Sequence, residues 1–268
     1  RASFPRFLGM ERNQRSLVLA ARAATKRAPM TDGRSHFVTF AGGMGRLTDA
    51  LADSISAAEV STGVAVSELR PDGAGYRLVL DDGTTVEAAA VVLAVPARTA
   101  ARLLAPIVPE ASAAIGGIAQ VSTSTATLVY RSHEIPDLRG TGFVVPAAQD
   151  RKVTGVTFLS NKWPGRVPDD RFVMVRAFVG GRHGQQAATS SPEQLMEVVR
   201  ADLAEMVGLR ADPVLVRVSQ WEGGLHRYTI GHLERVAEAE TALSGHPRLA
   251  LAGAAFHGIG LNECVASG

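Results

Sequence analysis

The chain has 268 residues, of which 46% are hydrophobic and 20% charged, and its formal net charge is +2. This composition is typical of a folded globular protein and excludes an intrinsically disordered chain. Because the net charge is small and the arginines are scattered, the sequence predicts no nucleic-acid partner.

Metal-binding and membrane-spanning patterns are missing from the sequence. Its one cysteine, Cys264, excludes an internal disulfide and a cysteine-based zinc site. The seven histidines show neither H-x-x-x-H nor H-E-x-x-H spacing, so no metal site is predicted. The longest apolar stretch, residues 88–97, has about half the length of a spanning helix, and no signal-like N-terminus precedes it. We therefore expect a cytoplasmic protein.

The first part of the chain predicts a helix, a short strand and a second helix. Apolar residues at helical spacing indicate a helix over 7–28, which Pro29 ends. Alternation over 36–41 favours a strand. The glycine-rich segment 42–47 then opens a helix to about residue 57.

Residues 60–97 predict a β-meander that leads into a buried strand. Val64, Val66 and Leu69 belong to a first strand, residues 76–80 to a second and residues 84–88 to a third. Asp82-Gly83 is typical of a hairpin turn between the last two. Residues 91–95 are all apolar, which indicates a strand buried on both faces. Such a meander fits an insertion in a dinucleotide-binding domain.

From residue 107 to 228 the pattern indicates an antiparallel sheet with a helix against it. The predicted strands are 122–130, 142–145, 153–160, 172–178 and 214–221. An amphipathic helix over 192–208 has apolar residues on one side, namely Leu195, Val198, Val199, Leu203 and Val207. A further helix follows over 232–243, and then a buried strand over 247–251.

The last seventeen residues pass from an apolar strand through glycines into a helix start. Such a turn offers backbone N–H groups and the positive end of the helix dipole to an anion. An ordinary strand-to-helix turn with close packing explains the same residues equally well. The local pattern leaves both interpretations open.

An ordered set of motifs gives the chain a family resemblance. The motifs are Gly42-Gly43-Met44-Gly45-Arg46-Leu47, residues 91–96, Gly142-Phe143-Val144-Val145-Pro146, Lys162-Trp163-Pro164, Phe178-Val179-Gly180-Gly181, Tyr228-Thr229-Ile230-Gly231-His232-Leu233 and residues 252–268. With this set, the chain resembles the C-terminal half to two-thirds of the flavin-dependent protoporphyrinogen/coproporphyrinogen oxidases, within the amine-oxidase-like flavoprotein superfamily.

The family's N-terminal strand–G-x-G-x-x-G–helix unit, which holds the FAD pyrophosphate, has no counterpart near the start of this sequence. We therefore expect a C-terminal fragment that alone holds FAD poorly and is inactive. The sequence upstream of Arg1 tests this expectation. A second departure lies at residues 222–227, which replace a proline-containing stretch of the family and predict a looser loop.

The resemblance implies a mixed α/β fold of the FAD-dependent amine-oxidase type with two interleaved domains. Residues 1–34 would be a helical part of the substrate domain and 106–231 the rest of it. Residues 35–105 and 232–268 would be parts of the FAD domain.

The implied function is the oxidation of coproporphyrinogen III or protoporphyrinogen IX to the porphyrin in haem biosynthesis, with FAD as cofactor and O2 as electron acceptor. Coproporphyrinogen is slightly favoured. The porphyrinogen is the implied partner, and a homodimer and peripheral membrane contact stay open. No catalytic base is assigned.

Site residues follow from the resemblance alone. The implied flavin contacts are Val64, Trp221, Ile259, Gly260 and Leu261, and the implied substrate contacts are Val144, Phe158, Phe178 and Phe143. Each apolar member is equally explained as an ordinary core residue. Arg176, Arg182 and Lys162 could meet substrate carboxylates, although solvated charges are the favoured interpretation. Cys264 is expected as a packed thiol, and His257 could face the flavin.

Two alternatives remain from the sequence. One is a related flavin amine oxidase or carotenoid desaturase, which would lack residues 162–164 and 228–233 of the motif set. The other is a non-catalytic piece that binds porphyrin or a partner protein.

Overall fold

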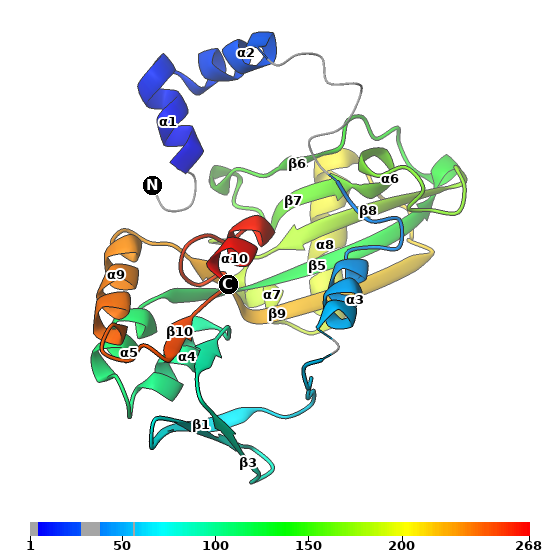
Figure 1. The fold of residues 1–268 in the computed structure, drawn as a ribbon. Helices are drawn as coiled ribbons and strands as arrows, with labels where there is room; N and C mark the ends of the chain where they lie inside the picture. Colours follow the sequence, from blue (N-terminus) through cyan, green and yellow to red (C-terminus); the bar gives the residue numbers. More distant parts are fainter. Residues whose placement is uncertain (1–4, 28–37, 56) are drawn as a thin grey trace. The chain divides into compact units, whose positions relative to one another are not determined.

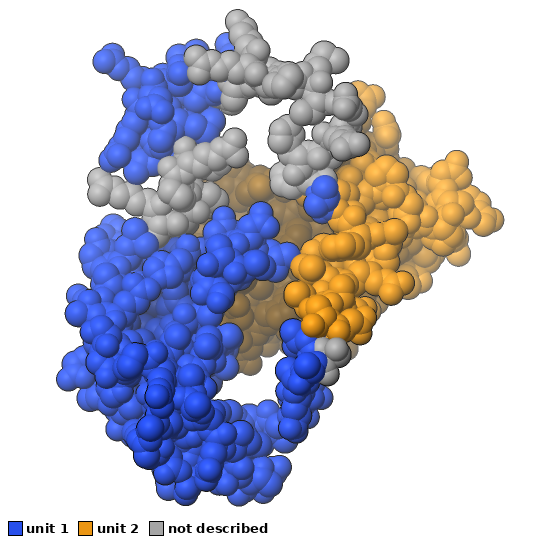
Figure 2. Space-filling model, viewed as in Figure 1, with its two compact units in different colours: residues 1–38, 55–119, 226–268 blue, residues 39–54, 120–225 orange. Residues whose placement is uncertain are grey.

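The computed structural model describes residues 5–27, 38–55 and 57–268 (Figure 1). The chain divides into two compact units (Figure 2). Unit 1 comprises residues 1–38, 55–119 and 226–268, and unit 2 comprises residues 39–54 and 120–225. The units interleave along the chain, but residues 106–119 belong to unit 1 and residues 39–54 to unit 2. The assignment of FAD and substrate roles to domains stays a prediction.

The N-terminal segment holds two helices where the sequence predicts one. Helix α1 spans Pro5–Gln14 and α2 spans Leu17–Arg27. The break falls at Arg15, whose φ of 56° is left-handed and incompatible with a continuous helix. Of the predicted strand at 36–41, residues 38–41 form no strand, and residues 36 and 37 lie outside the described residues. Helix α3, Gly45–Ser54, follows the glycine turn as predicted.

The predicted meander is confirmed in unit 1. It consists of β1 (Val66–Asp72), β2 (Gly75–Leu80) and β3 (Thr85–Ala88), paired antiparallel in that order. Gly83 adopts φ 85° in the turn between β2 and β3, a conformation that favours glycine. Leu69 and Tyr76 point into the core and are buried.

Strand β4 (Val91–Leu93) pairs in parallel with β10 (Leu249–Leu251), which joins the middle of the chain to its end. The expectation that residues 91–95 are buried on both faces is wrong. Val91 and Leu93 are buried, but Val92 is 62% exposed. Side chains alternate along a strand, and this two-stranded sheet has its core on one face.

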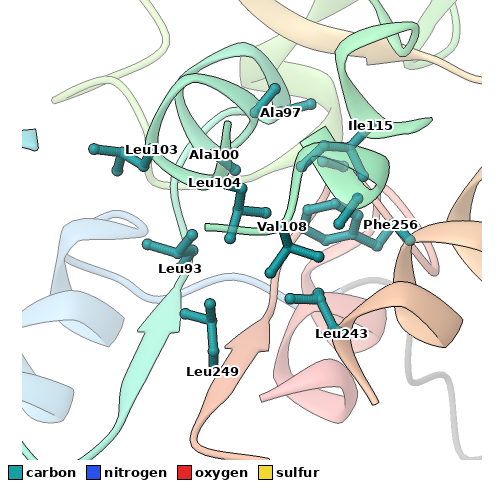
Figure 3. Packing of buried hydrophobic residues seen from close by; sticks show 14 of the residues in the cluster. Leu93, Ala97, Ala100, Leu103, Leu104, Val108, Ile115, Leu243, Leu249 and Phe256 are labelled. Carbon is teal, nitrogen blue, oxygen red and sulfur yellow. The ribbon is translucent and has the colours of Figure 1, made fainter. Parts of the chain in front are cut away.

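Three helices complete the core of unit 1 (Figure 3). They are α4 (Ala97–Leu104), α5 (Pro109–Gly116) and α9 (His232–Leu243), with α5 packed on both others. Leu93 and Leu249 of the paired strands meet Leu104, Val108 and Phe256 there. Helix α9 has the predicted bounds. Helix α10 (Leu261–Ser267) ends the chain.

Unit 2 is built on the predicted antiparallel sheet. Its strands lie in the order β6 (Gly142–Val144), β7 (Val153–Phe158), β8 (Phe172–Val179), β5 (Ala119–Arg131) and β9 (Leu215–Arg227). The pairs β6–β7, β7–β8 and β8–β5 are antiparallel. The expected loop at 222–227 is wrong, because β9 continues through these residues.

Helix α8 (Pro192–Val207) packs against one face of this sheet. Ser191 and Gln194 form a capping box at its start. Leu195, Val199 and Leu203 are fully buried in one cluster with Leu128 and Val175 of the sheet. The short helices of unit 2 are η1 (Ser132–Glu134), η2 (Ala147–Gln149), α6 (Leu159–Lys162) and α7 (Gln185–Ala188). Within the described ranges, no helix is long and apolar enough to cross a bilayer.

Candidate binding groove and terminal glycine bend

A groove of about 880 Å³ lies in unit 2 on the sheet face opposite α8. Its volume falls in the range of about 300–1,000 Å³ that is usual for ligand sites. It is lined by Thr123, Thr125, Thr127, Met174, Arg176, Phe178, Leu215, Arg217, Ser219, Trp221, Gly224 and Leu225. These residues come from β5, β8 and β9, and up to Trp221 they occupy alternate positions, because every second side chain of a strand faces the same side.

The strand register places two predicted substrate residues on one row of the groove face. Thr125 lies opposite Phe178, Phe178 opposite Gly155, and Gly155 opposite Val144. Val144 is 83% exposed and Phe178 is 36% exposed. Gly155 has no side chain, so the row is open between them. The predicted residues Val144 and Phe178 therefore share a face that a ligand can reach.

The other two predicted substrate residues lie on the opposite face. Phe158 is 4% exposed and belongs to the cluster under α8, and Phe143 packs against that cluster. Their rings meet edge to face, with centroids 6.1 Å apart. Each pairs with a core position of the next strand, Phe158 with Val175 and Phe143 with Val156. The structure thus places both in the core of unit 2, and neither lines the groove.

Trp221 lines the same groove as Phe178, although the resemblance connects it with the flavin. It is 48% exposed and is followed on β9 by Gly224 and Leu225, which also line the groove. Unit 2 therefore offers two aromatic side chains on one accessible apolar surface. The flavin role of Trp221 stays a prediction.

Two arginines line the groove, and the sequence reasoning missed one of them. Arg217 lies on β9 four residues before Trp221, so the alternation of a strand would have placed both on one face. Arg176 is half-buried and donates its Nε–H to Thr127 Oγ1 at 3.0 Å. Burial lowers the pKa of Arg176, and the nearby charge of Arg166 lowers it further. The groove therefore has a poorly solvated positive charge.

The remaining predicted cations of unit 2 lie outside the groove lining. Arg182 is exposed, and the Nζ of Lys162 lies 5.6 Å from the ring centre of Trp163. Across the described residues, no three or more His, Cys, Asp or Glu side chains gather where they could hold a metal ion.

The predicted glycine bend lies in unit 1 between β10 and α10. Gly253 adopts φ 105° and Gly258 φ 156°, both in the region that favours glycine. The hydroxyl of Tyr228 donates to the Ala254 carbonyl at 3.0 Å and accepts the Gly258 N–H at 2.9 Å. Burial raises the pKa of Tyr228, so its hydroxyl keeps the proton that it donates. The bend is therefore fixed by a side chain.

The amides that follow the bend are open to a ligand. Among the described residues, the N–H groups of Ile259, Gly260 and Leu261 have no hydrogen-bond acceptor. The Glu263 side chain lies against the bend, since a Cβ added to Gly260 would lie 2.0 Å from Glu263 Oε2. Unpaired N–H groups at a helix start attract negative charge, and the Glu263 carboxylate of the same helix is such a charge. The predicted contact of these residues with the negatively polarised edge of a flavin ring stays a prediction, and it requires the Glu263 side chain to turn away.

The other residues expected near the flavin are placed as follows. Val64 lies before β1 and is 40% exposed, and its adenine contact stays a prediction. His257 binds Glu240 of α9, with Nε2 and Oε1 2.6 Å apart. Cys264 is half-buried, and its Sγ lies 3.9 Å from the Gly258 carbonyl oxygen, as a packed thiol would.

The chain is similar to known proteins in sequence and in fold. The chain is 27% identical to coproporphyrinogen III oxidase of Bacillus subtilis over 276 residues, which covers 100% of this chain and 57% of that protein. It is 35% identical to coproporphyrinogen III oxidase of Propionibacterium freudenreichii over 238 residues, covering 86% and 43%. A crystal structure from Exiguobacterium sp. 255-15, named for protoporphyrinogen oxidase, superposes with a TM-score of 0.81 at 29% identity, covering 98% and 56%.

This chain therefore spans about half the length of the relatives that it matches. The profile of one family, described as flavin containing amine oxidoreductase, matches residues 2–268, nearly the whole chain. That family name confirms the predicted class of cofactor, and the superposition confirms the predicted fold class. The chain belongs to the family of flavin containing amine oxidoreductases.

Proposed function

We propose that the whole protein oxidises a porphyrinogen to the aromatic porphyrin with FAD as cofactor and O2 as final acceptor. The observation that carries this proposal is the groove of unit 2. It combines the aromatic side chains of Phe178 and Trp221 with two guanidinium groups. A flat, largely apolar macrocycle with carboxylate arms has the matching chemistry. The names of the similar proteins support the same activity.

In this proposal the groove binds and orients the substrate. Phe178 and Trp221 contact the apolar pyrrole rings and exclude water from them. The threonines of β5 have short side chains and therefore leave space above the sheet for a flat ligand. Val144, on the same face, extends the apolar surface towards the sheet edge. No protein side chain has to transfer a proton in this binding step.

The bend of unit 1 is the part of this chain that would hold the flavin ring. The amides of Ile259, Gly260 and Leu261 would face its polar edge, and Tyr228 fixes the main chain on which they lie. When bound, the flavin supplies the acceptor for the electrons that leave the substrate. The bend's contribution would be electrostatic, since oriented N–H groups favour negative charge once the Glu263 side chain has turned away.

The test is an aerobic oxidation assay on the protein expressed from its whole gene with added FAD. Coproporphyrinogen III is the substrate, and the fluorescence of the porphyrin product is recorded. Putrescine serves as the comparison substrate for the amine-oxidase alternative. We expect porphyrin formation well above the uncatalysed rate and no bleaching of the flavin absorbance by putrescine. A protein that binds FAD but forms no porphyrin contradicts the proposal.

A cytoplasmic location, peripheral membrane contact and a homodimer rest on the resemblance and stay predictions. The preference for coproporphyrinogen over protoporphyrinogen is likewise inferred from the resemblance, and the same assay with both substrates decides it.

A further inference from the structure

We propose that Arg176 and Arg217 bind two different carboxylates of the substrate and so fix how the macrocycle lies in the groove. This inference rests on the proposed function and deepens it, because it names the side chains that recognise the propionates.

Arg176 is prepared for an anion that the described residues do not supply. Its Nε–H is used by Thr127, which lies directly opposite on β5. Its terminal nitrogens have no acceptor in the described part of the chain. A guanidinium has five N–H donors in a rigid fork that matches a carboxylate. Thr127 thus orients the side chain and leaves the outer edge of the fork available.

The groove holds positive charge without a compensating acid. None of the twelve residues that line it is Asp or Glu, and two are arginines. Within the described ranges, neither Arg176 nor Arg217 forms an ion pair. Elsewhere in unit 2, Arg151 binds Asp202 and Glu205, while Arg171 binds Asp169. The uncompensated charge is therefore a feature of the groove, and it is complementary to an anionic ligand.

A third arginine, Arg166, adds positive charge near Arg176. Arg166 acts electrostatically on Arg176, and its own hydrogen bonds go to the Thr39 hydroxyl and the Phe40 carbonyl, neither of which is charged. Burial of Arg176 removes part of the water that would otherwise solvate its charge. A carboxylate bound at this place gains more than one bound to a fully hydrated arginine.

The sheet separates the two arginines. Arg176 lies on β8 and Arg217 on β9, with β5 between them. Neighbouring strands lie about 4.8 Å apart, so these two strands are about 10 Å apart. That spacing exceeds the size of one carboxylate. The proposal therefore gives each arginine its own carboxylate, with Phe178 beside Arg176 on β8 and Trp221 beside Arg217 on β9.

The experiment measures the affinity of the protein, expressed from its whole gene, for coproporphyrin III by titration of the porphyrin absorbance. The variants are Arg176→Gln and Arg217→Gln. Arg210→Gln is the matched control, because Arg210 is an exposed arginine of unit 2 outside the groove lining. The tetramethyl ester of coproporphyrin III serves as the ligand without charges. Circular dichroism of each variant checks that it is folded. If Arg176→Gln does not fold, Arg217→Gln still tests the inference.

We expect each groove variant to bind coproporphyrin III about ten-fold to about one hundred-fold more weakly than the unaltered chain. The control should differ by less than about two-fold, and binding of the ester should not respond to either substitution. Equal affinities of all variants, with binding by the unaltered chain intact, overturn this inference and leave the proposed function standing. No binding of coproporphyrin III by the unaltered chain counts against both.

Discussion

The rings of Tyr228 and His232 stack in unit 1, with their centroids 3.6 Å apart and their planes 14° from parallel. Each ring holds a different part of the terminal glycine bend. Tyr228 bonds Ala254 and Gly258, and the His232 Nε2 lies 2.9 Å from the Phe256 carbonyl oxygen. The motif at residues 228–233 therefore has a physical explanation, because it brings both rings against the bend.

Replacement of Tyr228 by phenylalanine tests this support. Tyr228→Phe keeps the stacked ring but leaves the Ala254 carbonyl and the Gly258 N–H without a partner. We expect a loss of about 1–3 kcal/mol in the free energy of unfolding, measured by urea denaturation, and faster amide hydrogen exchange at Gly258. Tyr76→Phe is the control, because the Tyr76 ring is buried but its hydroxyl has no hydrogen-bond partner among the described residues. Equal effects of both substitutions would show that the hydroxyl of Tyr228 does not hold the bend.

The pH dependence of stability should depend on His226. Its Nε2 accepts the N–H of Ala97, the first residue of α4, at 3.3 Å. Burial lowers the pKa of His226, and the neighbouring His232 lowers it further. The unfolded chain therefore takes up the proton first as the pH falls below the ordinary value of 6.5. The stabilisation is present above that value and is lost as the pH falls through the lower pKa of the folded state.

We expect the free energy of unfolding to decrease from about pH 7 to about pH 5 more steeply in the unaltered chain than in His226→Gln. The glutamine can still accept the Ala97 N–H through its side-chain oxygen, but it does not titrate. Urea denaturation at a series of pH values measures the two slopes. Identical slopes would mean that His226 is not the group responsible.

The two phenylalanines predicted as substrate contacts should respond in opposite ways to truncation. Phe158→Ala opens a cavity under α8 and should cost about 3–5 kcal/mol in the free energy of unfolding. Phe178→Ala, at an accessible position, should cost less than about 1 kcal/mol but weaken coproporphyrin III binding. Urea denaturation and porphyrin titration measure the two effects. A loss of binding without a loss of stability in Phe158→Ala would restore the role that the resemblance gives to Phe158.

Secondary structure was predictable where one physical signal dominates. The hairpin turn at Gly83 and the amphipathic pattern of α8 each fix an element locally. The break at Arg15 and the exposure of Val92 were not predictable, because they depend on what packs around these residues.

The site was predictable only in part, because the sequence does not say which face of the sheet each side chain occupies. A resemblance identifies positions such as Phe143 and Phe158 but not the side of the sheet to which each side chain points. The register of β6, β7 and β8 decides that, and it turns both residues towards α8. Arg217 could have been found from the alternation along β9. The bond between Arg176 and Thr127 could not, because the two residues are 49 positions apart.

The most direct test of the account asks whether a porphyrin occupies the groove. Ser219 lines it, so Ser219→Cys in a Cys264→Ser background places a single thiol there. Ser61→Cys in the same background is the control, because Ser61 is exposed in unit 1. The measurement is the rate of alkylation of each thiol with and without coproporphyrin III. We predict at least about ten-fold slower alkylation at residue 219 when the porphyrin is bound, with no change at residue 61. Unchanged alkylation at residue 219 under saturating porphyrin would contradict the account.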